Sequence, residues 1–381
     1  MKNIAIIGSG TMGLGIAQVF AEKGFQVKLY DNNTMNLTRA EAQFDAILEK
    51  LLAKNKIDFQ KKNEIKKALQ FVESLNDLSE SDLIIEAIIE DFEIKKILFS
   101  QIEPLVSSEC IIASNTSSLS ITGLAGSLEK ASQFIGIHFF NPAALMPLVE
   151  IIPGNQTEEK LIEKIKDLLI NCNKTPVIAK DTPGFIVNKI ARSYYGESIK
   201  IYEEGIANFE TIDFALKKHG NFKMGPFELM DMIGNDINFA VSKTVWEQFF
   251  YDERYKPSIT QQRLVQSKKL GRKTGSGYYD YTTSPHLIIN EDDTLGQLIF
   301  QRVISMLINE AYDTLYMRIA NAEDIETAMT KGVNYPKGLL LWGKEIGLKK
   351  IVQNLDNLFD TYHENRYRVS VLLRKLSEET L

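Results

Sequence analysis

The chain opens with an apolar strand that runs directly into three spaced glycines, in the stretch Asn3-Ile4-Ala5-Ile6-Ile7-Gly8-Ser9-Gly10-Thr11-Met12-Gly13. A helical pattern of apolar residues begins at once, and a second apolar run ends at Asp31. Strand, glycine turn, helix, second strand and acid together form the fingerprint of a dinucleotide-binding βαβ unit. The stretch therefore predicts a site for a nicotinamide or flavin nucleotide.

Each residue of this fingerprint has a physical task. Gly8 permits the tight turn, Gly10 leaves room for the pyrophosphate, and Gly13 lets helix and strand pack closely. The amino end of the helix offers N–H groups and a positive dipole to the phosphates. Asp31 can bind the ribose 2′-hydroxyl and would repel a 2′-phosphate, so the fingerprint favours NAD over NADP.

Size and composition narrow the class of protein. A chain of 381 residues with 44% hydrophobic and 25% charged residues is typical of a globular protein with two or three domains. The net charge of −6 argues against nucleic acid or an anionic membrane as the main partner. Cys110 and Cys172 are the only cysteines, so we expect no disulfide framework and no cysteine metal site. With its first strand at residue 3 and no membrane-spanning run, the chain is expected to be a cytoplasmic enzyme without a signal peptide.

Strand and helix patterns alternate over the first 182 residues. Continuous apolar runs between helices predict a doubly wound, mainly parallel α/β sheet of the Rossmann type. A long lysine-rich helical stretch is predicted from about residue 34 to 68. Turn residues at Asp181-Thr182-Pro183-Gly184 end the strand pattern, and the remainder is almost wholly helical.

The helical part contains an internal repeat. Ile206-Ala207-Asn208 recurs as Ile319-Ala320-Asn321, 113 residues later. The same offset relates Lys189 to Arg302, Glu197 to Glu310, Gly225 to Gly338 and Ile233-Gly234 to Ile346-Gly347. The alternative to a true repeat is a chance similarity between two amphipathic helical segments, but the many matches at one offset favour the repeat. We therefore predict a Rossmann domain at 1–182, followed by two all-α domains at 183–283 and 284–381 that arose by internal duplication.

His138 is the strongest catalytic candidate, because it stands at the carboxyl end of an apolar strand, where ligands of such sheets bind. After a proline-rich turn the chain re-enters an extended run that can bring Glu150 back beside His138. A carboxylate beside an imidazole orients the ring and stabilises its charged form, as a base for alcohol oxidation requires. Ser117 and Asn188 are further polar candidates, although each could equally be a helix cap or a satisfied core group.

Six motifs taken together resemble the L-3-hydroxyacyl-CoA dehydrogenase family, which includes the 3-hydroxybutyryl-CoA enzymes. They are Gly8 to Gly13, Asp82 to Ala87 with Glu90, Ser114 to Leu119, His138 to Pro142, Asp181 to Lys189 and Leu270 to Tyr281. The resemblance implies reversible hydride transfer between C3 of a 3-hydroxyacyl-CoA and NAD, in fatty acid metabolism such as β-oxidation. It implies catalytic or substrate-holding roles for His138, Glu150, Ser117 and Asn188. It implies cofactor contacts for Gly8, Gly10, Thr11, Met12, Gly13, Asp31, Glu90, Lys95, Asn115, Ser117, Asn141 and Lys273.

The second helical copy departs from the short members of the family. At the offset of the repeat Asn188 corresponds to Gln301, and Lys273 has no counterpart, so one active site per chain is expected. We expect the copy to pack as a partner subunit would, making the chain a pseudo-dimer, with further homodimer formation left open. Two other functions stay open: a non-catalytic nucleotide-binding protein and a dehydrogenase of free hydroxy acids.

Overall fold

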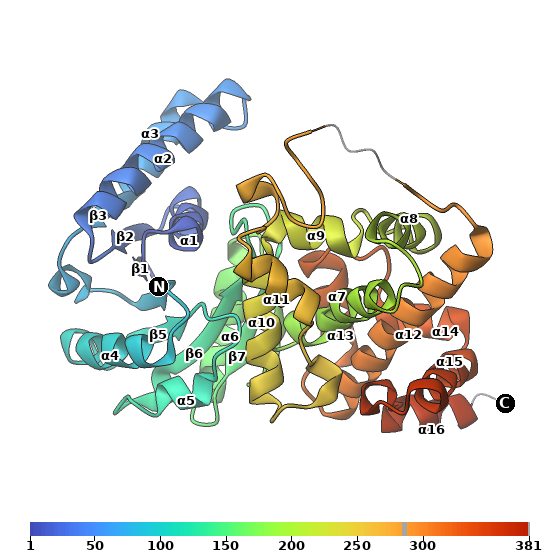
Figure 1. The fold of residues 1–381 in the computed structure, drawn as a ribbon. Coiled ribbons are helices and arrows are strands. Elements are labelled where there is room, and N and C mark those ends of the chain that lie inside the picture. The colour runs from blue at the N-terminus through green and yellow to red at the C-terminus, as the bar shows by residue number, and fades with distance from the viewer. Residues whose placement is uncertain (284–287, 380–381) are drawn as a thin grey trace. The chain divides into compact units, whose positions relative to one another are not determined.

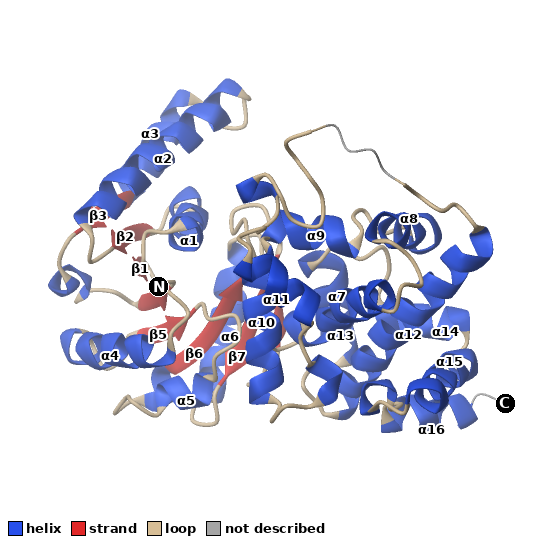
Figure 2. Cartoon of the chain, viewed as in Figure 1, coloured by secondary structure: helices blue, strands red, loops and turns tan. Residues whose placement is uncertain are grey.

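The computed structural model describes residues 1–283 and 288–379, and the chain divides into two compact units, Met1–Thr182 and Pro183–Leu381. The first unit contains an eight-stranded sheet in the order β3-β2-β1-β4-β5-β6-β7-β8 (Figures 1 and 2). The strands are β1 (Asn3–Ile7), β2 (Gln26–Tyr30), β3 (Leu69–Val72), β4 (Leu83–Glu86), β5 (Ile111–Ser114), β6 (Phe134–Phe139), β7 (Leu148–Pro153) and β8 (Thr175–Ile178). All neighbouring strands are parallel except β6 and β7. The predicted Rossmann-type fold of this region is confirmed.

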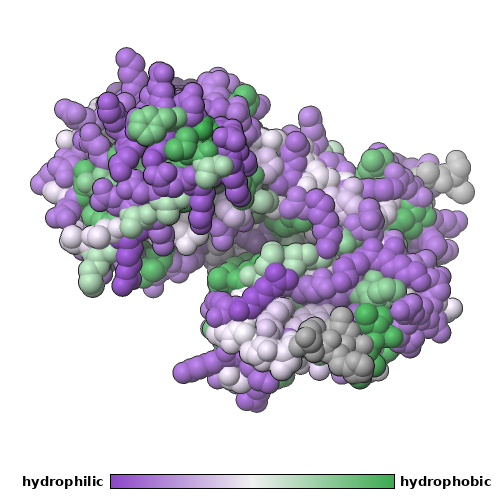
Figure 3. Space-filling model, turned by 90° about the horizontal axis from the view of Figure 1, so that it is seen from above, coloured by the Kyte–Doolittle hydropathy of each residue, from purple (hydrophilic) through white to green (hydrophobic). Residues whose placement is uncertain are grey.

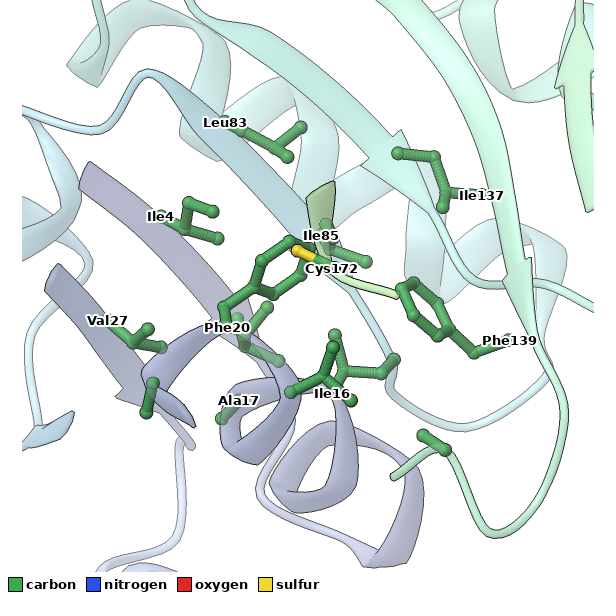
Figure 4. Close-up of a cluster of buried hydrophobic side chains, with 14 of the residues drawn as sticks. Ile4, Ile16, Ala17, Phe20, Val27, Leu83, Ile85, Ile137, Phe139 and Cys172 are labelled. Carbon is green, nitrogen blue, oxygen red and sulfur yellow. The ribbon is translucent and has the colours of Figure 1, made fainter. Parts of the chain in front are cut away.

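Helices cover both faces of the sheet. They are α1 (Thr11–Glu22), α2 (Thr34–Ala53), α3 (Phe59–Ala68), α4 (Phe92–Ile102), α5 (Ile121–Ala125) and α6 (Glu159–Asn171). Helices α1 and α6 share one apolar cluster with alternate residues of the strands. Figure 4 shows this cluster, in which Phe20 of α1 lies 6.3 Å from Phe139 of β6, with Cys172 nearby. On the other face Phe99 of α4 packs edge-on against Phe134 of β6 at 4.9 Å.

The lysine-rich stretch after β2 forms two helices rather than one. Helix α2 ends at Ala53, Asn55 has a positive φ of 52°, and a new helix starts after Asp58. The Asp58 side chain accepts a hydrogen bond from Lys61 N at 2.7 Å, so it caps α3. The predicted helical stretch from about residue 34 to 68 is therefore confirmed, and the left-handed turn and the cap divide it into two helices that reverse the chain. Figure 1 shows α2 and α3 side by side.

The described residues of the second unit form helices joined by loops, with two isolated β-bridges in the segment 271–280. Its helices are α7 (Val187–Glu203), α8 (Phe209–Gly220), α9 (Pro226–Ile233), α10 (Asn235–Gln248), α11 (Ile259–Gln266), α12 (Asp293–Tyr316), α13 (Ala322–Gly332), α14 (Leu339–Ile346), α15 (Leu348–Tyr362) and α16 (Val371–Glu379). Helix α12 packs extensively against α7 and α8. The predicted boundary at 283/284 adjoins residues 284–287, which lie outside the described residues.

Buried ion pairs join the α7 and α12 helices. Lys189 Nζ of α7 lies 3.0 Å from Glu310 Oε2 of α12, and both side chains are fully buried. Arg302 of α12 contacts Glu197 of α7 in a second buried pair. Arg254 also approaches Glu310, with Nη1 2.8 Å from Oε1. The charges of this interface therefore neutralise one another across the two helices.

The described helices include none that is both long and apolar enough to span a membrane. The face of the molecule in Figure 3 is covered mainly by hydrophilic residues, and hydrophobic residues occur on it in small groups.

Cys110 and Cys172 are both free thiols. Burial raises the pKa of Cys110 to about 12 and that of Cys172 to about 11.

We expect Glu310→Gln to lower the free energy of unfolding by about 3–5 kcal/mol, because it leaves Lys189 and Arg254 with less buried negative charge. Urea denaturation followed by circular dichroism measures this change. Glu345→Gln is the matched control, since Glu345 pairs with Lys337 at the surface, and it should cost less than about 1 kcal/mol. Equal losses for the two variants would contradict the assignment of Glu310 as a buried structural anchor.

Candidate active site

The candidate site lies at the carboxyl ends of β1, β4, β5 and β6, which are neighbouring strands inside the sheet. Parallel strands bring their following loops together at these ends, which is where ligands of open α/β sheets bind. The loops begin with Gly8 after β1, Ala87 after β4 and Asn115 after β5. The residues predicted to act in the first unit therefore gather from segments far apart in the sequence.

The glycine turn has the geometry that its sequence predicts. Gly8 has a φ of 101°, and a side chain there would lie 2.6 Å from the Ala87 carbonyl oxygen. A Cβ at Gly13 would lie 1.7 Å from the Gly8 carbonyl oxygen, so only glycine allows this approach of helix to strand. A Cβ at Gly10 would meet no atom within 4 Å. The space above the start of α1 is thus open, as the pyrophosphate of a dinucleotide requires.

Asp31 follows β2 and is tied to the glycine turn. Its Oδ2 accepts hydrogen bonds from Ser9 N at 2.9 Å and Ser9 Oγ at 2.8 Å, and Oδ1 accepts from Asn33 N at 3.0 Å. Partial burial raises the pKa of Asp31, but these hydrogen bonds more than offset it, so the net pKa lies below its ordinary value. The carboxylate therefore keeps its charge and also fixes the turn.

A cavity of about 710 Å³ lies beside this turn, and its volume is in the range of pockets that bind small molecules and cofactors. It is lined by the glycine turn and Asp31 on one side and by Ile94, Ile97 and Leu98 of α4 on the other. Ile94 and Ile97 are 43% and 58% exposed. These apolar residues suit the flat base of the nucleotide, and sequence reasoning missed them. Their helical spacing on an exposed face was the signal that could have found them.

Glu90, in the loop after β4, binds the segment that contains Ser117. Its Oε1 accepts hydrogen bonds from Thr116 Oγ1 at 2.6 Å, Ser117 N at 2.8 Å and Ser117 Oγ at 3.1 Å. Burial raises the pKa of Glu90, but the charge of Lys95 and these hydrogen bonds lower it below its ordinary value overall. An ionised Glu90 thus holds Ser117 in place.

Glu86 is a further site residue that the sequence reasoning did not assign. Lys95 Nζ lies 2.5 Å from Glu86 Oε1 and 3.3 Å from Glu90 Oε2, so Lys95 bridges two carboxylates. Ser114 Oγ donates to Glu86 Oε2 at 2.6 Å. Glu86 and Lys95 are both buried, so each is the countercharge that makes burial of the other tolerable. A glutamate ending an apolar strand was the available signal.

His138 and Glu150 face each other across the antiparallel pair of β6 and β7. His138 Nδ1 lies 2.7 Å from Glu150 Oε2, and the side chains are 8% and 0% exposed. Lys174 Nζ donates to the Ala143 and Met146 carbonyl oxygens at 2.6 and 2.9 Å, which fixes the turn between the strands. The predicted contact between the two side chains is therefore present in the structure.

The remaining predicted residues have different surroundings. Asn115 Oδ1 accepts a hydrogen bond from Phe139 N at 2.8 Å, which joins the ends of β5 and β6. Asn141 is exposed in the turn after β6. Asn188 is half-buried near the start of α7, and Lys273 Nζ lies 2.6 Å from Asp236 Oδ1 of α10. These last two residues belong to the second compact unit.

No group of histidine, cysteine, aspartate and glutamate suited to a metal ion occurs among the described residues.

Comparison with known proteins identifies the relatives of this chain. The family model described as the 3-hydroxyacyl-CoA dehydrogenase NAD binding domain matches residues 3–182. The model of the C-terminal domain of the same dehydrogenases matches residues 184–281 and 298–381.

Individual proteins resemble the chain over different lengths. The 3-hydroxyadipyl-CoA dehydrogenase of Escherichia coli K12 is 34% identical, over 98% of this chain and 97% of its own length. The 3-hydroxybutyryl-CoA dehydrogenase of Clostridioides difficile is 40% identical, over 73% of this chain and 99% of its own length. A crystal structure titled 3-hydroxybutyryl-CoA dehydrogenase from Escherichia coli K12 superposes with a TM-score of 0.95 at 34% identity, covering 99% of this chain and 98% of that one.

We expect Asp31→Ala to weaken NADH binding by roughly 10–100-fold, because a charged hydrogen-bond acceptor is lost. The preference for NADH over NADPH should narrow, since the carboxylate no longer repels the 2′-phosphate. Fluorescence titration with both cofactors measures the two dissociation constants. Asp45→Asn, at an exposed ion pair with Lys66, should leave both unchanged. An unaltered NADH/NADPH ratio in Asp31→Ala would disprove the role of Asp31 in cofactor choice.

Proposed function

Because the chain belongs to the 3-hydroxyacyl-CoA dehydrogenase family, we propose that it oxidises L-3-hydroxyacyl-CoA to 3-oxoacyl-CoA reversibly, with His138 and Glu150 as the acid/base pair. The observation that carries this proposal is the 2.7 Å contact between these side chains at the end of the sheet that also holds the glycine turn. NAD is the cofactor of this family's first domain. When bound, it would supply the acceptor for the hydride that leaves C3.

His138 acts as the general base in the oxidation. Because Nδ1 faces Glu150, Nε2 is the ring nitrogen that takes the proton of the C3 hydroxyl. The Glu150 carboxylate favours the tautomer with its proton on Nδ1 and stabilises the imidazolium that forms. In the reverse direction the imidazolium returns the proton to the C3 oxygen.

The other predicted residues hold the reactants. Ser117 and Asn188 would hydrogen-bond the oxygen atoms of the substrate. When NAD is bound, Asp31 would hold its ribose, and Asn141, Glu90, Lys95 and Lys273 would complete the contacts with the cofactor. The network that fixes Glu90 between Lys95 and Ser117 supports these roles, because it orders the groups before any ligand binds.

The named relatives leave the acyl group open between two chemistries. One relative is named for 3-hydroxyadipyl-CoA, whose acyl chain ends in a carboxylate. Another is named for 3-hydroxybutyryl-CoA, whose chain ends in a methyl group. We propose a short-chain substrate and a role in fatty acid metabolism at a cytoplasmic location.

The two helical halves are proposed to be copies of one domain. The family's C-terminal model matches both halves, and the offset of 113 residues relates Lys189 to Arg302 and Glu197 to Glu310. Lys189 pairs with Glu310, and Arg302 pairs with Glu197. Each half thus offers the other the same pair of charges, as two subunits do across a two-fold axis. We propose that the second half acts as a built-in partner and carries no active site.

His138→Gln should lower kcat by about 100- to 10,000-fold, because glutamine cannot accept the hydroxyl proton. Reduction of acetoacetyl-CoA, followed by loss of NADH absorbance, measures the rate. NADH affinity should not change. Glu150→Gln should lower kcat to a smaller extent, and the exposed His363→Gln serves as the matched control. Normal turnover by His138→Gln would rule out His138 as the base.

A chain that ends at residue 283 should dimerise or aggregate, because removal of α12 exposes the apolar face of α7 together with its buried charges. Light scattering at several protein concentrations measures the size of the particle. A well-behaved monomer would count against the built-in partner.

A further inference from the structure

Arg192 on α7 is a buried cation, and none of the carboxylates in residues 1–283 and 288–379 forms an ion pair with it. Its side chain donates from Nε to the Asn188 carbonyl oxygen at 3.0 Å, and from Nη1 to Ser242 Oγ at 3.0 Å and the Asn238 carbonyl oxygen at 3.3 Å. All three acceptors are neutral. The residue is only 8% exposed. A charge in such a place is costly unless an anion accompanies it.

The other buried lysines and arginines of the described chain either lie beside a carboxylate or donate their hydrogen bonds to backbone carbonyl oxygens. Carboxylates lie within 4.0 Å of Lys95, Lys189, Arg254 and Arg302. Lys174 binds two backbone carbonyl oxygens of the turn that it fixes. Arg192 differs because its Nη2 donates no hydrogen bond to any described residue, although the Tyr195 ring lies 5.0 Å from its Cζ. The ring attracts the cation but supplies no countercharge.

The position of Arg192 places this unmatched charge close to the residue proposed to hold the substrate. Asn188 and Arg192 are separated by one helical turn, so they lie on the same side of α7, roughly 5–6 Å apart at their Cβ atoms. The hydrogen bond from Arg192 Nε to the Asn188 carbonyl ties the guanidinium to that turn. A short acyl chain held at Asn188 can span such a distance.

We propose that Arg192 binds a carboxylate at the far end of the acyl chain, so that the preferred substrate is the 3-hydroxyacyl-CoA of a short dicarboxylic acid. A guanidinium matches a carboxylate in charge and in planar geometry, and Nη2 has two donors to offer. The inference rests on the proposed function and selects the carboxylate end over the methyl end.

The test compares two substrates of equal chain length, L-3-hydroxyadipyl-CoA and L-3-hydroxyhexanoyl-CoA, with the full chain and NAD. The unaltered chain should show kcat/KM at least about tenfold higher for the adipyl substrate. Arg192→Met should lower that value by roughly 10–100-fold, mainly through KM, and change the hexanoyl value by less than about threefold. Arg192→Lys should restore part of the preference because it restores the charge.

Ser242→Ala is the matched control, because it removes one tie between α7 and α10 and keeps the guanidinium. It should retain the preference for the adipyl substrate. Equal losses on both substrates in Arg192→Met would assign Arg192 a purely structural role and overturn the inference. If the unaltered chain turns over both substrates without preferring the adipyl substrate, the inference about Arg192 is overturned and the proposed function stands. If it turns over neither substrate, the proposed function is overturned as well.

Discussion

The antiparallel pairing of β6 with β7 is the constraint on which the candidate active site depends. His138 stands directly opposite Glu150 in this pair, and both side chains lie on the same face of the sheet. Because side chains alternate along a strand, a slip of one residue would move either group to the opposite face. Lys174 fixes the turn between the strands, and Asn115 fixes the end of β6. The facing of His138 and Glu150 therefore rests on backbone pairing and on the hydrogen bonds of two further side chains.

The carboxylates around the site are held in place by hydrogen-bond donors of the same unit. Asp31 is held by Ser9, Glu90 by Ser117, and Glu86 by Lys95. Each carboxylate has donors in place within the first unit, so its orientation does not wait for a ligand. Groups held in this way lose little conformational entropy when they meet a substrate or a cofactor. The same network also ties the loop after β4 to the loop after β5, which the sequence separates by a whole helix.

Local physics explains why much of this site was predictable. The glycine turn and Asp31 follow from short-range backbone rules, and the return of Glu150 to His138 follows from two apolar strands joined by a proline-rich turn. The position of the break between α2 and α3 did not follow from the helical pattern, because a left-handed residue and one cap decide it. Glu86, Ile94 and Ile97 were missed because their roles depend on tertiary neighbours. Arg192 shows the same limit, since an unmatched charge is visible only when the surroundings are known.

The packing of α12 against α7 has a consequence for behaviour in solution. Two helices that belong to separate subunits part on dilution, because association follows mass action. Here both helices belong to one polypeptide and meet at an effective concentration that dilution does not alter. The helical unit should therefore keep its buried ion pairs at protein concentrations where a two-chain assembly would dissociate. The interface between α7 and α12 is thus kept intact by the covalent connection of the two helices and does not depend on protein concentration.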